Sequence, residues 1–167
     1  MTFTVMTVCT GNICRSPMAE VVLRDAFERA GLGDRVTVRS TAVTSEEIGN
    51  PIDSRAQRVL REAGYDVPRR EAVRVRSDDA ARTDLTLAMT RHHARELRRL
   101  GFPADEVVLF RAFEDGAPDG DPAAIDAADT PDPWYGGPED FAECLETVEA
   151  CAPGVVEYVR RRLDAAS

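Results

Sequence analysis

Residues 5–20 constrain the fold of this 167-residue chain more than any other stretch. An apolar, strand-like run ends at Cys9, and a helical pattern follows, with Ser16 in a good position for an N-cap and Pro17 for the first helical turn. The turn between them is short. A loop held between a strand end and a helix start directs backbone N–H groups, and the positive end of the helix dipole, toward one point. The sequence therefore predicts an anion-binding loop after the first strand.

A cysteine begins this loop and an arginine ends it, in the spacing Cys-x5-Arg from Cys9 to Arg15. That spacing alone also occurs by chance, with a buried cysteine and an unrelated surface arginine. Here the N–H groups, the dipole and the guanidinium would together favour the Cys9 thiolate, the nucleophilic form. Arg15 can hold two oxygens of a tetrahedral dianion, and Gly11 and Asn12 tolerate the positive φ that such a loop requires. A thiolate beneath a bound phosphate is suited to moving a phosphoryl group onto sulfur.

Residues 8–17 read Val-Cys-Thr-Gly-Asn-Ile-Cys-Arg-Ser-Pro, which resembles the signature of the low-molecular-weight protein-tyrosine phosphatases. The resemblance implies hydrolysis of protein phosphotyrosine through a cysteinyl-phosphate intermediate, with Cys9 as nucleophile and Arg15 as phosphate clamp. It also implies that Ser16 hydrogen-bonds the Cys9 thiolate and that Asn12 holds the loop by reaching Ser40. The remaining loop residues would bind substrate: Thr10, Gly11, Ile13 and Cys14.

A second motif lies at residues 130–137, Thr-Pro-Asp-Pro-Trp-Tyr-Gly-Gly. An aspartate beside a proline is by itself most often an ordinary turn. The motif is similar, however, to the general-acid loop of the same family. The resemblance implies that Asp132 protonates the leaving oxygen and then activates water against the cysteinyl-phosphate. Trp134 and Tyr135 would line the crevice and stack on an aromatic substrate ring.

The resemblance extends over essentially the whole chain, including residues 44–55 and Phe141, with two departures. The family usually places Trp or Tyr on the 41–51 loop, where this chain has Glu46. We expect Glu46 at the rim of the substrate crevice; the alternative is that it points into solvent and that Glu47 or neither residue borders the site. The segment 111–131 is longer and more acidic than usual. It is either functional or mobile, or simply a solvated acidic surface.

Periodicity predicts strands at about 5–9, 35–40, 85–89 and 107–110. It predicts helices at about 16–30, 53–64 and 91–100 and from 138 onward, the last kinked or interrupted at Pro153 and Gly154. Residues 66–83 are expected to form a loop with a short helical turn. Alternating strands and helices predict a single α/β domain over residues 1–167, with a central four-stranded parallel sheet flanked by helices. The phosphate-binding loop would lie at the carboxyl end of the first strand, where ligands bind in such sheets.

Composition narrows the class of partner and compartment. A net charge of −9 disfavours nucleic acid or an anionic membrane as a partner, and no apolar run approaches the roughly 18 residues of a membrane span. We expect no signal peptide, because the N-terminal apolar run is short and strand-like. We expect no metal and no cofactor, because no Cys/His cluster has ligand spacing. Four cysteines, one of them placed as a nucleophile, favour a reducing cytoplasm. The expected partner is a tyrosine-phosphorylated protein, with a tyrosine kinase as a further candidate.

The two histidines and the last two cysteines of the chain are not expected to take part in the chemistry. His92 and His93 lie on an arginine-rich helix and are expected on its solvated face, whereas Cys144 and Cys151 lie on the apolar stripe of the last helix. A related fold reduces arsenate with a cysteine pair, so arsenate reductase is one alternative. In that fold the cysteine pair lies on a mid-chain segment, and the corresponding residues of this chain, 82–91, contain no cysteine. A binding module without turnover is another.

A phosphoarginine phosphatase is the third alternative. Relatives of that specificity carry threonine where this loop has Ile13, and an apolar β-branched side chain favours an aromatic leaving group. Cys14, in the same loop as Cys9, is either a redox partner that forms a protective disulfide with it or a small buried residue.

Overall fold

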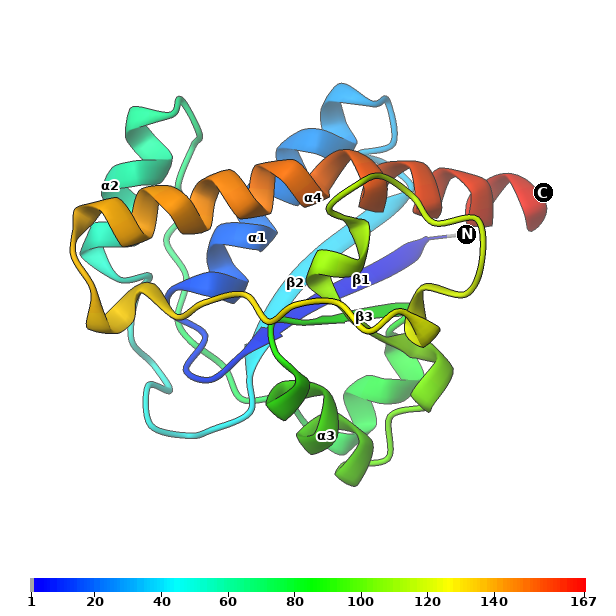
Figure 1. Ribbon diagram of the computed structural model, residues 1–167, viewed down its shortest axis with the longest axis horizontal. Helices are drawn as coiled ribbons and strands as arrows, with labels where there is room; N and C mark the ends of the chain where they lie inside the picture. Colours follow the sequence, from blue (N-terminus) through cyan, green and yellow to red (C-terminus); the bar gives the residue numbers. More distant parts are fainter. Residues whose placement is uncertain (1) are drawn as a thin grey trace.

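The computed structural model describes residues 2–167, and its centre is a four-stranded parallel sheet (Figure 1). The strands are β1 (Phe3–Cys9), β2 (Val36–Ala42), β3 (Leu85–Ala88) and β4 (Val107–Leu109). They lie in the order β2-β1-β3-β4, and every neighbouring pair is parallel. The predicted α/β fold is confirmed.

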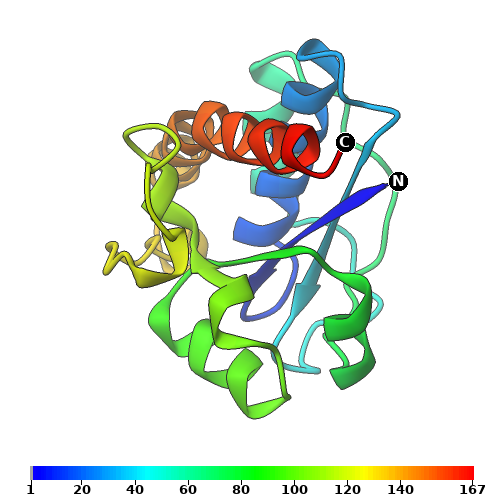
Figure 2. The same cartoon turned by 90° about the vertical axis from the view of Figure 1, so that its right-hand side faces the viewer.

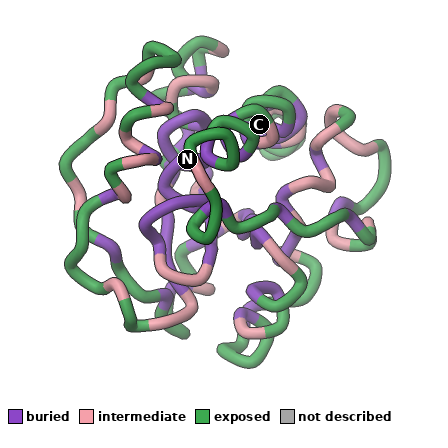
Figure 3. Tube along the Cα trace, turned by 60° about the vertical axis from the view of Figure 1, so that its left-hand side comes forward, coloured by how far each residue is buried: buried purple, intermediate pink, exposed green. Residues whose placement is uncertain are grey.

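Helices cover both faces of this sheet. Helices α1 (Arg15–Arg29), α2 (Ser54–Glu62) and α4 (Pro138–Ala165) pack together on one side, and α3 (Arg91–Arg99) lies on the other (Figure 2). Successive side chains of β1 lie on opposite faces of the sheet. Val5 lies in the larger core beneath α1 and α4, and Met6 lies in the smaller core beneath α3. The buried part of the chain is therefore the sheet together with the inner faces of the helices, as Figure 3 shows.

The topology brings two distant segments to the carboxyl ends of the central strands. Cys9 ends β1 beside Ala42 of β2. After β3, the carbonyl of Met89 accepts a hydrogen bond of 2.8 Å from the backbone N–H of Thr130. This bond places residues 130–135 next to the loop that follows β1, as the fold class predicts for a ligand site.

Helix α4 runs without interruption from Pro138 to Ala165, so of the predicted kink or interruption at Pro153 and Gly154 the interruption is wrong. Pro153 lies on the exposed side of the helix. Gly154 faces the core so closely that a Cβ atom there would come within 2.6 Å of the carbonyl oxygen of Phe113. The apolar stripe on either side is buried, and this packing offsets the hydrogen bond that a proline removes from a helix interior.

The acidic segment after β4 contains short turns and ion pairs. It contains short 3-10 turns at Phe110–Phe113 and Pro122–Ala124. Arg111 pairs with Glu114, and Arg91 of α3 pairs with Asp126.

In residues 66–83, the predicted helical turn is the 3-10 helix Ser77–Arg82. Among residues 2–167, no helix combines the length and apolarity that crossing a bilayer requires.

Candidate active site

One pocket of about 190 Å³ brings together the two sequence motifs. The loops after β1 and β2 and the segment before α4 all contribute to it. Its walls contain every predicted site residue except Asn12 and Ser16, which are buried behind the loop. The lining residues are Cys9, Thr10, Gly11, Ile13, Cys14, Arg15, Glu46, Glu47, Asp132, Trp134 and Tyr135.

The sulfur of Cys9 lies 3.0 Å from the hydroxyl oxygen of Ser16. That oxygen accepts a hydrogen bond of 2.8 Å from the side-chain amide of Asn12, so its own proton is left for the Cys9 sulfur or for the Thr41 carbonyl oxygen, which lies 3.3 Å away. Ser16 is therefore not the N-cap that the sequence predicted. The helix begins one residue earlier, at Arg15, and Cys14 precedes it without a side-chain cap. The Ser16 hydroxyl faces the nucleophile candidate instead of the helix end.

Asn12 holds the loop in shape. It has a φ of 60°, whereas Gly11, which the sequence paired with it, does not have a positive φ. The Asn12 amide nitrogen also donates to the Ser40 hydroxyl at 2.9 Å, as the resemblance implied. The side chain of Arg70 donates to the carbonyl and the side-chain oxygen of Asn12, a contact that the sequence did not predict.

Arg15 is a buried guanidinium, 4% exposed, that reaches from the first motif to the second. Its Nη1 donates to the carbonyl oxygen of Thr130 at 2.9 Å. Its Nη2 lies 3.4 Å from the Asp132 carboxylate and 3.4 Å from the Thr10 hydroxyl. The cation therefore lies at the edge of the pocket, between the loop that contains Cys9 and the loop that contains Asp132.

The Asp132 segment is a short 3-10 turn, Pro133–Tyr135, capped by Asp132 itself through the backbone N–H of Trp134 at 3.1 Å. Arg55 supports this turn from α2. It donates to the Trp134 carbonyl at 3.2 Å, and its guanidinium carbon lies 5.1 Å from the centre of the Trp134 ring. Tyr135 is 88% exposed, so its ring is free to meet a ligand.

His93 is buried at the site, so the expectation that it lies on a solvated helix face is wrong; His92 is exposed, as expected. The Nδ1 atom of His93 accepts the backbone N–H of Thr90 at 3.2 Å, and its Nε2 lies 2.9 Å from the Thr10 hydroxyl. Burial, together with the positive charge of Arg15, lowers the pKa of His93 from 6.5 to about 3. The ring is therefore neutral, with its proton on Nε2. The spacing Thr90-x-x-His93 is the local signal that could have indicated an inward-facing ring.

Both glutamates of the loop after β2 border the pocket. Glu46 is exposed at the rim, in agreement with the expectation that it borders the site. Glu47 is half-buried, accepts a hydrogen bond of 2.6 Å from Asn50, and packs so close to Gly11 that a Cβ there would lie 3.1 Å from it. A side chain at position 11 would therefore have to displace the Glu47 side chain.

The four cysteines are free and buried. Cys14 shares the pocket with Cys9. Burial, reinforced by the Asp53 carboxylate, raises the pKa of the Cys14 thiol well above its ordinary value. Burial also raises the pKa of the Cys144 and Cys151 thiols to about 12, and both pack in the core beneath α4, as expected.

The chain is similar to known proteins both in sequence and in fold. Residues 4–165 match the family model described as low molecular weight phosphotyrosine protein phosphatase. Low molecular weight protein-tyrosine phosphatase A of Mycobacterium bovis is 41% identical over 156 residues, which cover 93% of this chain and 91% of that protein. A low molecular weight protein-tyrosine-phosphatase of Streptomyces coelicolor is 40% identical over 167 residues and 98% of each chain. The crystal structure of YfkJ from Bacillus subtilis superposes with a TM-score of 0.85, at 26% identity and over 97% of each chain.

Proposed function

The chain belongs to the low molecular weight phosphotyrosine protein phosphatase family, and from this membership we propose that it hydrolyses phosphotyrosine in proteins. The observation that carries the proposal is the pocket that joins the Cys9 sulfur, the Arg15 guanidinium and the Asp132 carboxylate. These groups are a nucleophile, a phosphate clamp and a general acid.

In the first step, the Cys9 thiolate attacks phosphorus and the bond from phosphorus to the phenolic oxygen breaks. Protonated Asp132 gives its proton to that oxygen, so tyrosine leaves neutral and Asp132 becomes a carboxylate. Arg15 pairs with two of the phosphoryl oxygens in a bidentate fork, which a planar guanidinium provides and an ammonium does not. Backbone N–H groups at the start of α1 are the remaining donors for the phosphoryl oxygens.

In the second step, the Asp132 carboxylate takes a proton from water while the water oxygen attacks phosphorus. The bond from sulfur to phosphorus breaks, inorganic phosphate leaves, and Cys9 returns as a thiolate. The Ser16 hydroxyl, 3.0 Å from the sulfur, stabilises that negative charge by donating a hydrogen bond. Asn12 keeps Ser16 in this orientation by occupying its acceptor site.

The walls of the pocket support an aromatic phosphoester over phosphoarginine. Trp134 and Tyr135 are exposed aromatic rings at the mouth, and Ile13 presents an apolar side chain beside them. For the arsenate alternative, Cys144 and Cys151 would have to supply electrons, but both thiols are buried in the core with raised pKa values.

We place the enzyme in the cytoplasm, acting on tyrosine-phosphorylated proteins, with a tyrosine kinase as a candidate partner. Its four free cysteines support a reducing compartment.

The test is a comparison of matched phosphotyrosine and phosphoarginine peptides with the wild type, Cys9→Ser and Arg15→Lys. Wild type should hydrolyse the phosphotyrosine peptide faster, and both variants should lose turnover. Cys9→Ser should still bind inorganic phosphate because Arg15 remains. Arg58→Lys, an exposed change on α2, is the matched control and should retain wild-type rates. Faster hydrolysis of phosphoarginine, or turnover by Cys9→Ser above about a thousandth of wild type, would contradict the proposal.

A further inference from the structure

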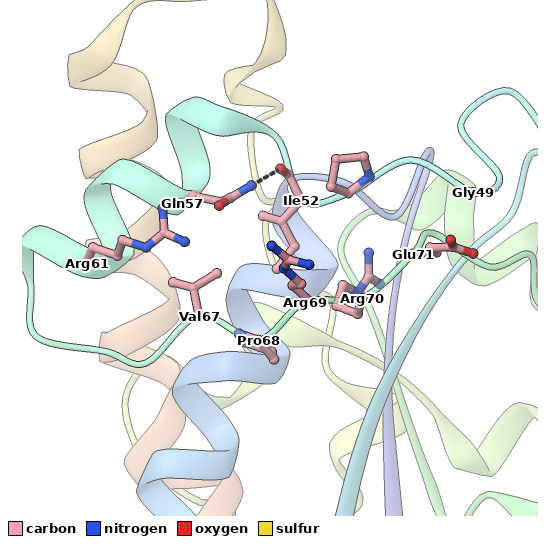
Figure 4. A pocket seen from close by; sticks show the side chains of 10 residues that line it. Gly49, Ile52, Gln57, Arg61, Val67, Pro68, Arg69, Arg70 and Glu71 are labelled. Atoms are coloured by element: carbon pink, nitrogen blue, oxygen red, sulfur yellow. Dashed lines mark hydrogen bonds between the residues drawn. The ribbon is translucent and has the colours of Figure 1, made fainter.

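A second, larger pocket of about 620 Å³ lies behind the phosphate loop, between α2 and residues 67–71 (Figure 4). Three arginines line it: Arg61 from α2, and Arg69 and Arg70 from the facing segment. Apolar side chains, among them Ile52 and Val67, form part of its wall. No group named in the proposed reaction belongs to this pocket.

The positive charge in this second pocket is only partly balanced by the protein, through the Glu20 carboxylate near Arg70 and the Glu71 carboxylate at the pocket wall. The arginines elsewhere form twelve ion pairs with carboxylates, but within residues 2–167 none of these pairs involves Arg61, Arg69 or Arg70. One carboxylate, Glu71, also borders the pocket and is exposed. Three guanidiniums in one concave space, in a chain of net charge −9, form a local positive field suited to a polyanion.

Arg70 belongs to this pocket and to the phosphate loop at the same time. Its Nη1 donates to the Asn12 carbonyl at 2.8 Å, and its Nη2 donates to the Asn12 side-chain oxygen and, at 2.9 Å, to the Ser40 hydroxyl. All three acceptors are neutral. Burial lowers the pKa of Arg70, since its cation is partly removed from water. Asn12 in turn holds Ser16, whose oxygen lies 3.0 Å from the Cys9 sulfur.

From this arrangement we propose that the pocket binds a small phosphate-type polyanion and that its occupancy slows the phosphatase. The second half of this proposal rests on the proposed function. A charged acceptor forms hydrogen bonds about twice as strong as a neutral one, so a bound anion competes with Asn12 and Ser40 for the N–H groups of Arg70. As Arg70 turns toward the anion, Asn12 loses its support and the Ser16–Cys9 contact loosens. The effect falls on kcat, because the loop is weakened whether or not substrate is bound.

The experiment measures hydrolysis of p-nitrophenyl phosphate against inorganic pyrophosphate, at an ionic strength held constant with sodium chloride. Pyrophosphate at the catalytic site competes with substrate and raises KM alone. Pyrophosphate at the second pocket should lower kcat by about fivefold, the lower end of typical couplings between sites. The double variant Arg61→Gln/Arg69→Gln should lose the kcat effect and keep the competitive one. Arg58→Gln, on the same helix and outside the pocket, should keep both.

The two proposals fail in different ways. Loss of basal hydrolysis or of competitive inhibition concerns the catalytic site, whereas the kcat effect reports only the second pocket. Purely competitive inhibition of the wild type would overturn the inference. So would a kcat effect that survives in the double variant. If a glutamate-rich peptide lowers kcat and pyrophosphate does not, the pocket recognises a protein surface and the inference is wrong.

Discussion

The Nε2 nitrogen of His93 donates a hydrogen bond of 2.9 Å to the hydroxyl oxygen of Thr10, joining α3 to the loop after β1. The same oxygen lies 3.4 Å from Nη2 of Arg15, so it faces two donors. Its own proton must therefore point away from both. Thr10 lines the pocket that contains Cys9, and its hydroxyl is thus oriented as a donor for a bound anion.

Replacing Thr10 with valine keeps the shape of the side chain and removes the acceptor of His93. We expect Thr10→Val to lower the free energy of unfolding by about 1–3 kcal/mol, because a buried N–H is left without a partner. It should also raise KM for p-nitrophenyl phosphate. Thr10→Ser, which keeps the hydroxyl, should restore KM. Denaturant unfolding and steady-state kinetics on the three proteins check this; a valine variant equal to wild type in both would show that the hydroxyl has no role.

The lowered pKa of His93 predicts a loss of stability in acid. The folded pKa is about 3 and the unfolded value about 6.5, so the unfolded chain binds the additional proton between these limits. Stability from this residue is present above pH 6.5 and is lost as the pH falls toward 3, by up to about 1.4 kcal/mol per pH unit. Wild type and His93→Gln should be compared by urea unfolding across this range. Parallel pH profiles would mean that His93 is not buried as a neutral ring.

His93 also shows what the sequence could not predict. Its helix was predicted, but its partner lies 83 residues away in the chain, and an arginine-rich helix favours the assumption of a solvated face. Cys9 and Arg15 were identifiable because strand, turn and helix start fix the loop locally. Asp132 was identifiable only through resemblance, because it reaches Arg15 through the tertiary structure.

The predictions of one helix start and of one helix interruption failed for a related reason. Ser16 has the propensity of an N-cap, but its hydroxyl bonds to Asn12 and Cys9, which the fold brings to it. Pro153 has the propensity of a helix breaker, yet burial on both sides keeps α4 continuous. Local propensity decides such positions only where tertiary contacts do not compete.

Asp132→Asn should reduce the rate by about 10²–10⁴, the usual effect of losing a general acid or base. The asparagine oxygen can still accept the Trp134 N–H, so the turn should keep its shape. The loss should be greater for phosphotyrosine than for p-nitrophenyl phosphate, whose leaving group needs less protonation. Measuring kcat on both substrates distinguishes a general acid from a structural residue. Equal losses on the two substrates would assign Asp132 a structural role.

From the position of Cys14 in the pocket we predict that oxidation of Cys9 is reversible, and that the disulfide between Cys9 and Cys14 forms faster at higher pH. Peroxide would convert Cys9 to a sulfenic acid, and condensation with the Cys14 thiol would release water and form a disulfide. Because burial raises the pKa of Cys14, this closure should be slow at neutral pH and accelerate as the pH rises. Activity should return with dithiothreitol in the wild type but not in Cys14→Ser after prolonged peroxide. Equal recovery of the two proteins would rule out the protective disulfide.

Glu46 predicts a preference for basic sequences around the phosphotyrosine. It is an exposed carboxylate at the pocket rim, where the family usually has an aromatic ring, and Glu47 lies beside it. Arg-flanked peptides should therefore be hydrolysed with a higher kcat/KM than Asp-flanked peptides, most clearly at low salt. Glu46→Trp should reduce this preference and lower KM for small aryl phosphates, through a stacking contact of about 0.5–1.5 kcal/mol.

Glu47→Gln is the matched control, because it removes the neighbouring charge and adds no ring. The assay compares the two peptides at two salt concentrations with wild type and both variants. If Glu46 is responsible, Glu46→Trp should remove most of the salt-dependent difference, whereas Glu47→Gln should remove little, since the Glu47 carboxylate is directed toward Asn50. Equal kcat/KM values for the two peptides at low salt would leave Glu46 as an ordinary surface residue.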